Sequence, residues 1–286
     1  MLSQNIKMAI RKLILKHPEK AIPIFQEFYR EFTAEKRVLP NFLIIGAQRC
    51  GTTSLYDYIS EHPNMIPSPV KELYYFNDNF DKGLNWYKEY FPLKSHMKKD
   101  YITGEATPNY LFNPYTAERV KKTIPNVKLI VLLRNPIERA YSHYNFMKKL
   151  GQESLSFEEA LNHETERISS ELNHQDKTQY CVGHNLSSFS YRLRGLYAEQ
   201  LSIWLKHFPR EQFLFIQSEK FYKNTAAEYW RVIEFLELPK HNKINFKQLN
   251  EGKYLAMAPK LYDSLKEFYQ TKNQDLFDLI GEKYDW

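Results

Sequence analysis

The segment NFLIIGAQRCGTTSLYDYI, residues 41–59, places the tightest constraint on the fold of this chain. Residues 41–46 form a continuous apolar run, which is typical of a parallel strand covered on both faces. The run breaks at Gly46, and residues 52–61 then carry apolar side chains at helical spacing. The segment therefore predicts a strand, a loop bounded by glycines, and a helix.

The same alternation of strands and helices continues along the chain. Further strands are predicted around 101–105, 127–134 and 212–217, and helices at 113–124, 135–150, 187–209, 224–238 and 259–280. Asn135 and Asn224 are suited to N-cap two of these helices, and Pro114 and Pro136 to occupy a first turn. Alternating strands and helices predict an α/β fold with a parallel sheet, in which ligands bind at the carboxyl ends of the strands.

A single domain is predicted over residues 39–286. Two regions are considered separately, one before this domain and one within it. Residues 1–38 indicate a helical extension that is basic and amphipathic; it packs against the domain or lies on a membrane surface. Residues 150–190 read as an insert or lid, which is polar and irregular with few apolar anchors over 150–187. The chain shows no pattern of a signal peptide, and its two cysteines fit a reducing compartment, so a cytoplasmic location is expected.

The loop GAQRCGTT, residues 46–53, predicts an anion site at a helix start, where free backbone N–H groups and the helix dipole face the ligand. The P-loop pattern of nucleotide triphosphatases is similar, but it carries a lysine after its last glycine. Here Thr52 holds that position, and the basic group is Arg49, three residues upstream. An ordinary strand–turn–helix is the alternative interpretation.

A second anion site is predicted after the strand at 127–134. Arg134 ends this strand where magnesium-dependent P-loop enzymes place an acidic residue, so ATP chemistry with a metal is disfavoured. Arg134 offers a planar fork to phosphate, and Ser142 adds a hydroxyl two turns into the following helix. Both would face the first loop if the two strands are neighbours. Arg139 is expected in a structural ion pair, and no metal site is predicted.

With both sites in place, the chain resembles the sulfotransferases that use 3′-phosphoadenosine 5′-phosphosulfate (PAPS). The resemblance is carried by FLIIGAQRCGTTSLYDYISEHP, KELYYFNDNFDKGLNWYKEYFP, KLIVLLRNPIERAYSHY and RGLYAEQLSIWLKHFPREQFLFIQSEKF, and it covers most of residues 41–236. It is strongest for carbohydrate (heparan-type) sulfotransferases, while residues 250–286 are similar to bacterial members. It implies a P-loop-like, three-layer fold and transfer of a sulfuryl group to a hydroxyl or amine, on a glycan, a glycolipid or a small molecule.

The resemblance also implies roles for particular residues. The 5′-phosphosulfate would be held by the first loop, through Gln48, Arg49, Cys50, Gly51, Thr52 and Thr53. The 3′-phosphate would be held by Arg134 and Ser142, with Lys253 closing a C-terminal loop over the nucleotide. Glu72 matches the acidic residue that serves as catalytic base, and Arg49 would stabilise charge on the leaving phosphate. The family's lysine after the residue matching Glu105 is replaced by Ala106.

Several alternatives stay open at this level. Glu72 is either the general base or a member of a structural salt bridge, and Lys71 either assists catalysis or points into solvent. His143, next to Ser142, is either a third catalytic group or a structural histidine. Two other classes compete with a sulfotransferase: a nucleotide kinase with a P-loop, and a non-catalytic protein that binds an anionic polymer, which the net charge of +6 would favour. Nucleic acid is not predicted as a partner.

Overall fold

The computed structural model describes residues 26–172, 183–241, 246 and 255–286, and its centre is a parallel sheet. The sheet has four strands in the order β2-β1-β3-β4, and every pair is parallel. The strands are β2 (Gly104–Ala106), β1 (Phe42–Gly46), β3 (Lys128–Leu133) and β4 (Phe213–Gln217). All four were predicted, and all five residues of β1 are buried, as its continuous apolar run indicates.

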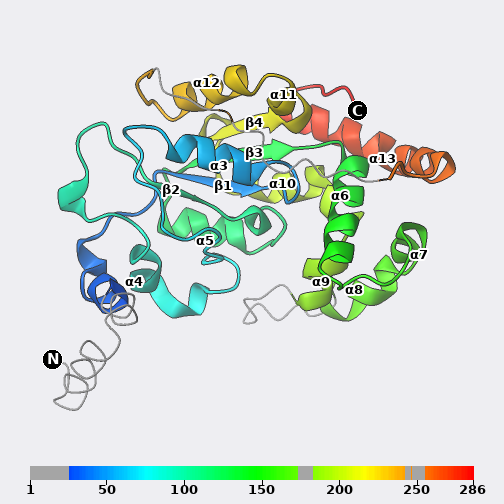
Figure 1. Cartoon of the computed structure of the whole chain (residues 1–286), viewed down its shortest axis with the longest axis horizontal. Coiled ribbons are helices and arrows are strands. Elements are labelled where there is room, and N and C mark those ends of the chain that lie inside the picture. The colour runs from blue at the N-terminus through cyan, green and yellow to red at the C-terminus, as the bar shows by residue number, and fades with distance from the viewer. Residues whose placement is uncertain (1–25, 173–182, 242–245, 247–254) are drawn as a thin grey trace, which may run out of the picture.

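Helices cover both faces of this sheet, which confirms the predicted three-layer α/β fold (Figure 1). α3 (Thr52–Ser60) contacts β1 and α12 (Thr225–Phe235), and these two helices form one outer layer. α5 (Thr116–Thr123) and α10 (Tyr197–His207) contact each other and form the second layer. One large apolar cluster runs through the strands and both layers.

The caps of two helices are as predicted, and one helix start is not. The Asn135 side chain accepts hydrogen bonds from the amides of Ile137 and Glu138 at the start of α6 (Pro136–Lys149). Asn224 caps α12 in the same way. The prediction that Pro114 lies in the first turn of its helix is wrong, because α5 begins only at Thr116.

The predicted long helix over residues 187–209 is also wrong. This stretch contains the end of α9 (His184–Phe189), the 3-10 helix η5 (Leu193–Gly195) and α10. Hydrogen bonds to α8 (Glu164–Leu172) give the physical reason for the break, because the Glu164 carboxylate accepts from the amides of Arg192 and Leu193 and takes both out of a helical ladder. The backbone next to them is also tightly packed, since a Cβ atom at Gly195 would lie 2.6 Å from the Tyr269 hydroxyl oxygen and 3.0 Å from Pro136 Cβ.

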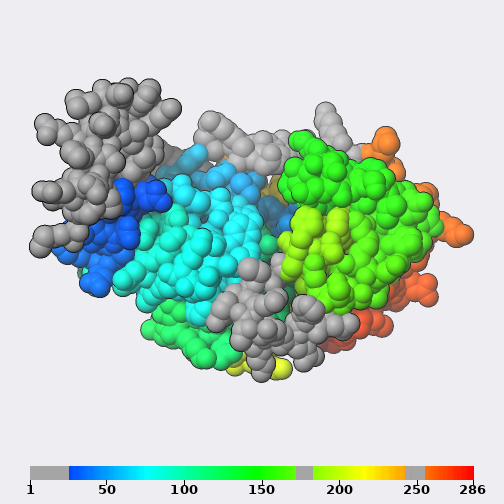
Figure 2. Space-filling view, turned by 90° about the horizontal axis from the view of Figure 1, so that it is seen from below, coloured from blue at the N-terminus to red at the C-terminus, as the bar shows by residue number. Residues whose placement is uncertain are grey.

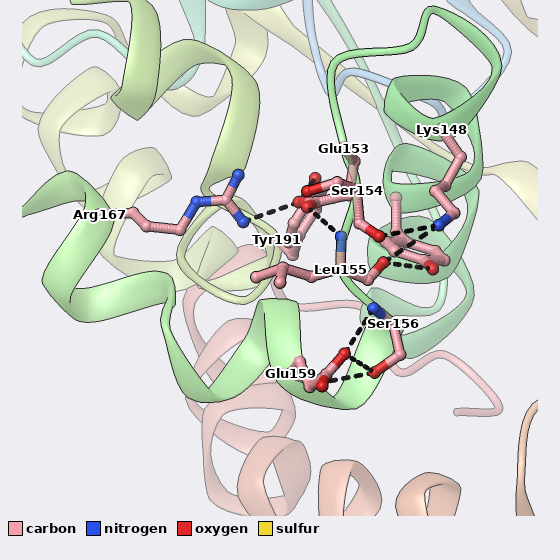
Figure 3. A network of polar contacts seen from close by, with 9 residues as sticks. Lys148, Glu153, Ser154, Leu155, Ser156, Glu159, Arg167 and Tyr191 are labelled. Carbon is pink, nitrogen blue, oxygen red and sulfur yellow. Dashed lines mark hydrogen bonds and ion pairs between the residues drawn. The ribbon is translucent and has the colours of Figure 1, made fainter.

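Residues 150–187 are more regular than predicted, as far as they are described. They contain α7 (Phe157–Asn162), α8 (Glu164–Leu172) and the start of α9, and their apolar side chains share a second core with α6 and α13 (Pro259–Ile280). Figure 3 shows the polar contacts around Glu153, whose carboxylate accepts from Arg167 at 2.7 Å and from the Tyr191 hydroxyl at 2.8 Å. The prediction that residues 150–187 are irregular and have few apolar anchors is therefore wrong for the described part of this segment.

Shorter elements complete the described chain. They are α4 (Gly83–Lys88), α11 (Ser218–Lys223) and the 3-10 helices η1 (Ala34–Lys36), η2 (Phe80–Lys82), η3 (Lys94–His96), η4 (Pro108–Tyr110) and η6 (Arg210–Gln212). Residues 26–38 are the described part of the predicted N-terminal extension, and residues 1–25 lie outside the described ranges. No helix within those ranges is both long and apolar enough to cross a membrane.

Candidate active site

The first predicted anion site has the geometry of a tight loop at a helix start. The chain leaves β1 at Gly46, turns through residues 47–50 and enters α3 after Gly51. Gly51 has a φ of 93°, in the left-handed region, and a Cβ atom there would lie 2.7 Å from the Tyr222 hydroxyl oxygen. Glycine is thus required twice over, for its conformation and for the close approach of Tyr222. No side chain caps α3, so its first amides are available to a ligand.

Arg49 connects this loop to the second predicted anion site. Its Nε donates a hydrogen bond to Ser142 Oγ at 3.2 Å, across 93 residues of sequence. Its guanidinium carbon also lies 4.6 Å from the centre of the Phe146 ring, one turn further along α6. Both contacts hold the arginine against α6, so the first loop and this helix meet at Arg49.

Arg134 follows directly after β3, and β1 and β3 are neighbours, so the condition for a shared cleft is met. Its guanidinium lies 3.6 Å from the Glu138 carboxylate, an exposed pair of the kind that contributes little stability. Ser142 is buried in α6. The carbonyl oxygen of Arg134 accepts a hydrogen bond from the Tyr197 hydroxyl at 2.9 Å, which anchors the turn into α6.

Lys71 and Glu72 reach the same loop from a different part of the chain. Lys71 Nζ donates to Thr53 Oγ1 at 3.0 Å and lies 3.3 Å from Glu72 Oε1. Lys71 therefore points to the start of α3 and not away into solvent. The Glu72 side chain is 24% exposed, so it is only partly covered by its neighbours.

The surface of the molecule is hollowed at this place. Figure 2 shows a hollow between the cyan surface of residues 70–100 and the green surface of α6 and the segment with α7–α9, with blue atoms of the first strand and helix at its floor. Residues 70–100 carry Lys71 and Glu72, and α6 carries Ser142. The printed contacts join these segments, because Lys71 donates to Thr53 and Arg49 donates to Ser142.

A buried arginine, Arg194, extends the site and was missed in the sequence. Its Nη1 donates to Asn109 Oδ1 at 2.7 Å, and its guanidinium carbon lies 4.2 Å from the centre of the Phe112 ring. Burial lowers the pKa of Arg194 to about 9, and the negative charge of Glu72 opposes this shift. Arg194 is the first residue of the block RGLYAEQLSIWLKHFPREQFLFIQSEKF, which carries part of the resemblance, and that block is the signal that could have found it.

His143 is fully buried in α6, and neither ring nitrogen has a hydrogen-bond partner in the described chain. Burial lowers its pKa well below the ordinary value, and the charges of Arg139, Arg194 and Arg49 act in the same direction. A neutral, enclosed imidazole is poorly suited to exchange a proton with a substrate. We therefore give His143 no catalytic step.

Arg139 differs from its predicted role. It is fully buried and donates to the backbone carbonyl of Tyr191, and no ion pair with a carboxylate is found for it among the described residues. The pKa of Glu164 is raised by burial, and Arg139 lowers it in part, so the two charges interact at longer range. Arg139 thus joins α6 to the segment before α10.

The other predicted ligands of the loop differ in what their side chains can offer. Cys50 is buried, burial raises the pKa of its thiol, and its amide donates to the Ala47 carbonyl at 3.2 Å, so the residue closes the loop from within. Gln48 Oε1 is buried without a hydrogen-bond partner. Thr52 is buried and Thr53 exposed at the start of α3. Lys253 lies outside the described residues.

A metal centre was not predicted. Within the described ranges, no group of three or more His, Cys, Asp or Glu side chains could hold a metal ion.

Substitution of Gly51 by alanine tests the loop geometry. We expect a loss of about 1–3 kcal/mol in the free energy of unfolding, because the left-handed φ and the contact with Tyr222 both penalise a Cβ atom. Urea denaturation measures this loss. Gly151→Ala is a matched control, since Gly151 has a φ of 71° but nothing within 4 Å of the added Cβ, and it should cost less.

Comparison with known proteins identifies the family of this fold and site. The sulfotransferase domain family matches residues 39–277. The sulfotransferase from Alicyclobacillus acidocaldarius superposes with a TM-score of 0.70 at 30% identity, covering 86% of this chain and 98% of that one. Membrane-associated sulfotransferase kil1 from Dictyostelium discoideum is 27% identical over 99% of this chain and 72% of its own length. Heparan sulfate glucosamine 3-O-sulfotransferase 3B1 from Mus musculus is 27% identical over 88% of this chain and 66% of its own.

The chain belongs to the sulfotransferase domain family, and it is an enzyme of the PAPS-dependent sulfotransferase class. The predicted resemblance is thereby confirmed.

Proposed function

We propose that this protein transfers the sulfuryl group of PAPS directly to a hydroxyl or amine of an acceptor, without a metal ion, with Glu72 as general base. The observation that carries the proposal is the contact chain from the loop helix to the carboxylate. Thr53 accepts from Lys71 at 3.0 Å, and Lys71 lies 3.3 Å from Glu72. These two contacts join the anion-binding start of α3 to the carboxylate that would accept the proton.

The chemistry divides between the two sides of the cleft. The oxygen or nitrogen of the acceptor substrate forms the new bond to sulfur. As this bond forms, Glu72 takes up the proton that the oxygen or nitrogen loses. The bond between sulfur and the bridging oxygen breaks, and its electron pair leaves with the phosphate of adenosine 3′,5′-bisphosphate. Arg49, Lys71 and the first amides of α3 stabilise the negative charge that builds on that phosphate.

The remaining contacts position the nucleotide. We assign the 3′-phosphate to Arg134 and Ser142, which lie one strand away from the first loop. The hydrogen bond between Arg49 and Ser142 supports this assignment, because it brings the two phosphate sites into contact. We further propose that Lys253 closes over the nucleotide, and that residues 150–190 contribute to the acceptor site as a lid.

The acceptor is proposed to be a glycan or glycolipid. The likeness to a mouse enzyme named for heparan sulfate glucosamine supports a carbohydrate. Exposed aromatic side chains on residues 26–32, of which Phe32 is 87% exposed, and the basic sequence before them support a weak peripheral contact with a membrane surface. A cytoplasmic location stays a prediction.

Nucleotide selectivity tests the proposed cofactor. We expect adenosine 3′,5′-bisphosphate at 100 times its Kd to stabilise the fold by about 2.7 kcal/mol, since a ligand that binds only the native state adds RT ln(1 + [L]/Kd). A thermal shift assay compares it with ATP and magnesium, which should have a much smaller effect. Stabilisation by ATP and magnesium alone would support a kinase and overturn the proposal.

Transfer itself is measured with ³⁵S-labelled PAPS against a panel of acceptors. A heparan-type oligosaccharide, a galactosyl glycolipid, a small alcohol and a small amine separate the acceptor classes. Labelled product from the first or second is expected. Nucleotide binding without transfer to any acceptor would favour a non-catalytic binding protein.

A further inference from the structure

Glu105 is a buried carboxyl group of β2 that the proposed mechanism does not use. Its side chain is 1% exposed and accepts hydrogen bonds from three hydroxyl groups. Oε1 accepts from Tyr87 at 2.6 Å and from Tyr110 at 2.9 Å, and Oε2 accepts from Thr107 at 2.9 Å. No arginine, lysine or histidine of the described chain forms a salt bridge with Glu105, so hydroxyl groups alone satisfy it.

Two of these hydroxyls also bind the backbone that follows Glu72. The Tyr110 hydroxyl accepts from the amides of Tyr75 at 3.0 Å and Phe76 at 3.4 Å. Thr107 Oγ1 accepts from the amide of Tyr74 at 3.4 Å. A hydroxyl has one hydrogen, and when that hydrogen points to a carboxylate its lone pairs are left for other donors. The ionised carboxylate therefore turns both hydroxyls into acceptors for three successive amides.

The segment held in this way has an unfavourable conformation. Tyr74 has a φ of 52°, in the left-handed region that an aromatic residue rarely adopts, and its carbonyl closes a turn by accepting from the amides of Asp78 and Asn79. Such a conformation persists only where surrounding contacts enforce it. Tyr74 also forms a side-chain hydrogen bond with Glu72, so the placement of this turn determines the position of the catalytic carboxylate.

We propose that Glu105 is a positioning residue for the transfer reaction: through the hydroxyls of Thr107 and Tyr110, its carboxylate fixes residues 74–76 and so aims Glu72 into the cleft. This inference rests on the proposed role of Glu72. Glu105 itself touches neither substrate nor nucleotide.

The protonation of Glu105 should then control activity. Burial raises the pKa of Glu105 to about 7, although the hydrogen bonds from its three hydroxyl partners lower this pKa in part. The titratable groups that face it are Tyr87 from α4, Tyr110 from η4, Tyr56 from α3 and the more distant Glu72. Burial raises the pKa of Tyr87, Tyr110 and Tyr56, which keeps these phenols protonated as donors. Below pH 7 the carboxyl group is protonated and is a weaker acceptor than the carboxylate, so it holds the hydroxyls of Thr107 and Tyr110 less firmly in their orientation toward the backbone amides.

Activity and stability should respond to this titration with opposite signs. The pKa of Glu105 in the fold lies above its ordinary value of 4.5, so the folded state binds the proton more tightly than the unfolded state. The contribution of Glu105 to stability is therefore fully present below about pH 4.5 and is lost as the pH rises toward 7. Activity needs the carboxylate and should rise over the upper part of the same interval. A purely structural role would make activity follow stability.

The variant Glu105→Gln tests the proposal, because it keeps the volume of the side chain but cannot accept from all three hydroxyls. With the fastest acceptor of the panel above, we expect kcat to fall about 10- to 100-fold. The acid limb of the pH profile near pH 7 should disappear. The Kd for adenosine 3′,5′-bisphosphate should stay within about twofold, since β1, β3 and α6 hold the phosphates.

Two tyrosines provide a matched pair of controls. Tyr110→Phe removes a hydroxyl that joins Glu105 to the backbone and should lower kcat as Glu105→Gln does. Tyr87→Phe removes a hydroxyl whose described partner is Glu105 alone, so it should move the acid limb to higher pH and leave the plateau kcat within about threefold.

The outcomes separate this inference from the function of Glu72. If Glu72→Gln is inactive and Glu105→Gln retains kcat and its acid limb, the positioning role is overturned and the base stands. If Glu105→Gln lowers nucleotide affinity, melting temperature and kcat together, Glu105 is structural and the proposal also fails. If Glu72→Gln itself turns over normally, the assignment of the base fails, whatever Glu105 does.

Discussion

Replacement of Glu72 by glutamine should remove most sulfuryl transfer while the protein still folds and binds nucleotide. Glutamine has nearly the same shape but cannot accept the acceptor's proton, and general-base catalysis contributes about 10²- to 10⁴-fold in rate. Lys71 loses one partner at 3.3 Å but keeps its hydrogen bond to Thr53, so the phosphate loop should be unaffected. Single-turnover transfer from labelled PAPS measures the chemical step, and a thermal shift with adenosine 3′,5′-bisphosphate measures binding.

Glu211→Gln is the control for this variant. Glu211 is an exposed glutamate in η6, which precedes β4 and so lies at the opposite end of the strands from the first loop, and its replacement removes the same charge without touching the cleft. We expect it to match the wild type in both assays. Near-normal turnover by Glu72→Gln would exclude Glu72 as the general base and leave a structural salt bridge with Lys71 as its role.

The second large effect is expected for Arg49→Ala. Fixed positive charge at a leaving group stabilises the transition state more than the ground state, and removal of one such donor costs about 10²- to 10³-fold in kcat. Arg49 has a φ of 69° in the loop, so alanine at this position keeps some backbone strain. Arg49→Lys retains the charge but not the fork that reaches Ser142, and it should recover part of the rate.

Arg134→Ala provides the comparison for Arg49→Ala. Loss of one charged hydrogen bond to the 3′-phosphate should weaken nucleotide binding by about 1.5–3 kcal/mol, or roughly 10- to 150-fold, with kcat at saturation little changed. Kd comes from equilibrium titration with adenosine 3′,5′-bisphosphate, and kcat from saturating PAPS. The reverse pattern, with Arg49→Ala affecting only Kd and Arg134→Ala only kcat, would exchange the two assigned sites. The bond to Ser142 predicts that Arg49→Ala also weakens binding to some degree.

Local chemistry explains which elements could be predicted. β1 and β3 are continuous apolar runs bounded by glycine or arginine, and Asn135 with Pro136 marks the start of α6 by side-chain and ring geometry alone. The loop at 46–53 could be predicted equally well as a tight turn between strand and helix, because Gly46 and Gly51 mark its two ends. Such signals extend over only a few residues and need no knowledge of distant partners.

The errors lie where distant contacts override local preference. Helical spacing over 187–209 is real, but the Glu164 carboxylate of α8 accepts from the amides of Arg192 and Leu193 and takes them out of a helical ladder. Residues 150–187 look polar because charged side chains such as Glu153 and Arg167 are satisfied by one another, while their apolar neighbours pack on α6 and α13. The spacing of apolar residues within one segment does not show hydrogen bonds or packing with distant segments.

The sequence by itself determined the class of fold, the tight loop between β1 and α3, and the absence of a lysine where Thr52 stands, because each depends on residues that are adjacent in the chain. Only the tertiary structure decided how the site is assembled. It brought Arg49 to Ser142 across 93 residues and turned Lys71 toward Thr53. It also placed Glu105 behind the segment that carries Glu72, through hydroxyls of Thr107 and Tyr110. These contacts arise from strand order and helix packing, and hydrogen bonds between such distant residues leave no pattern in either segment alone.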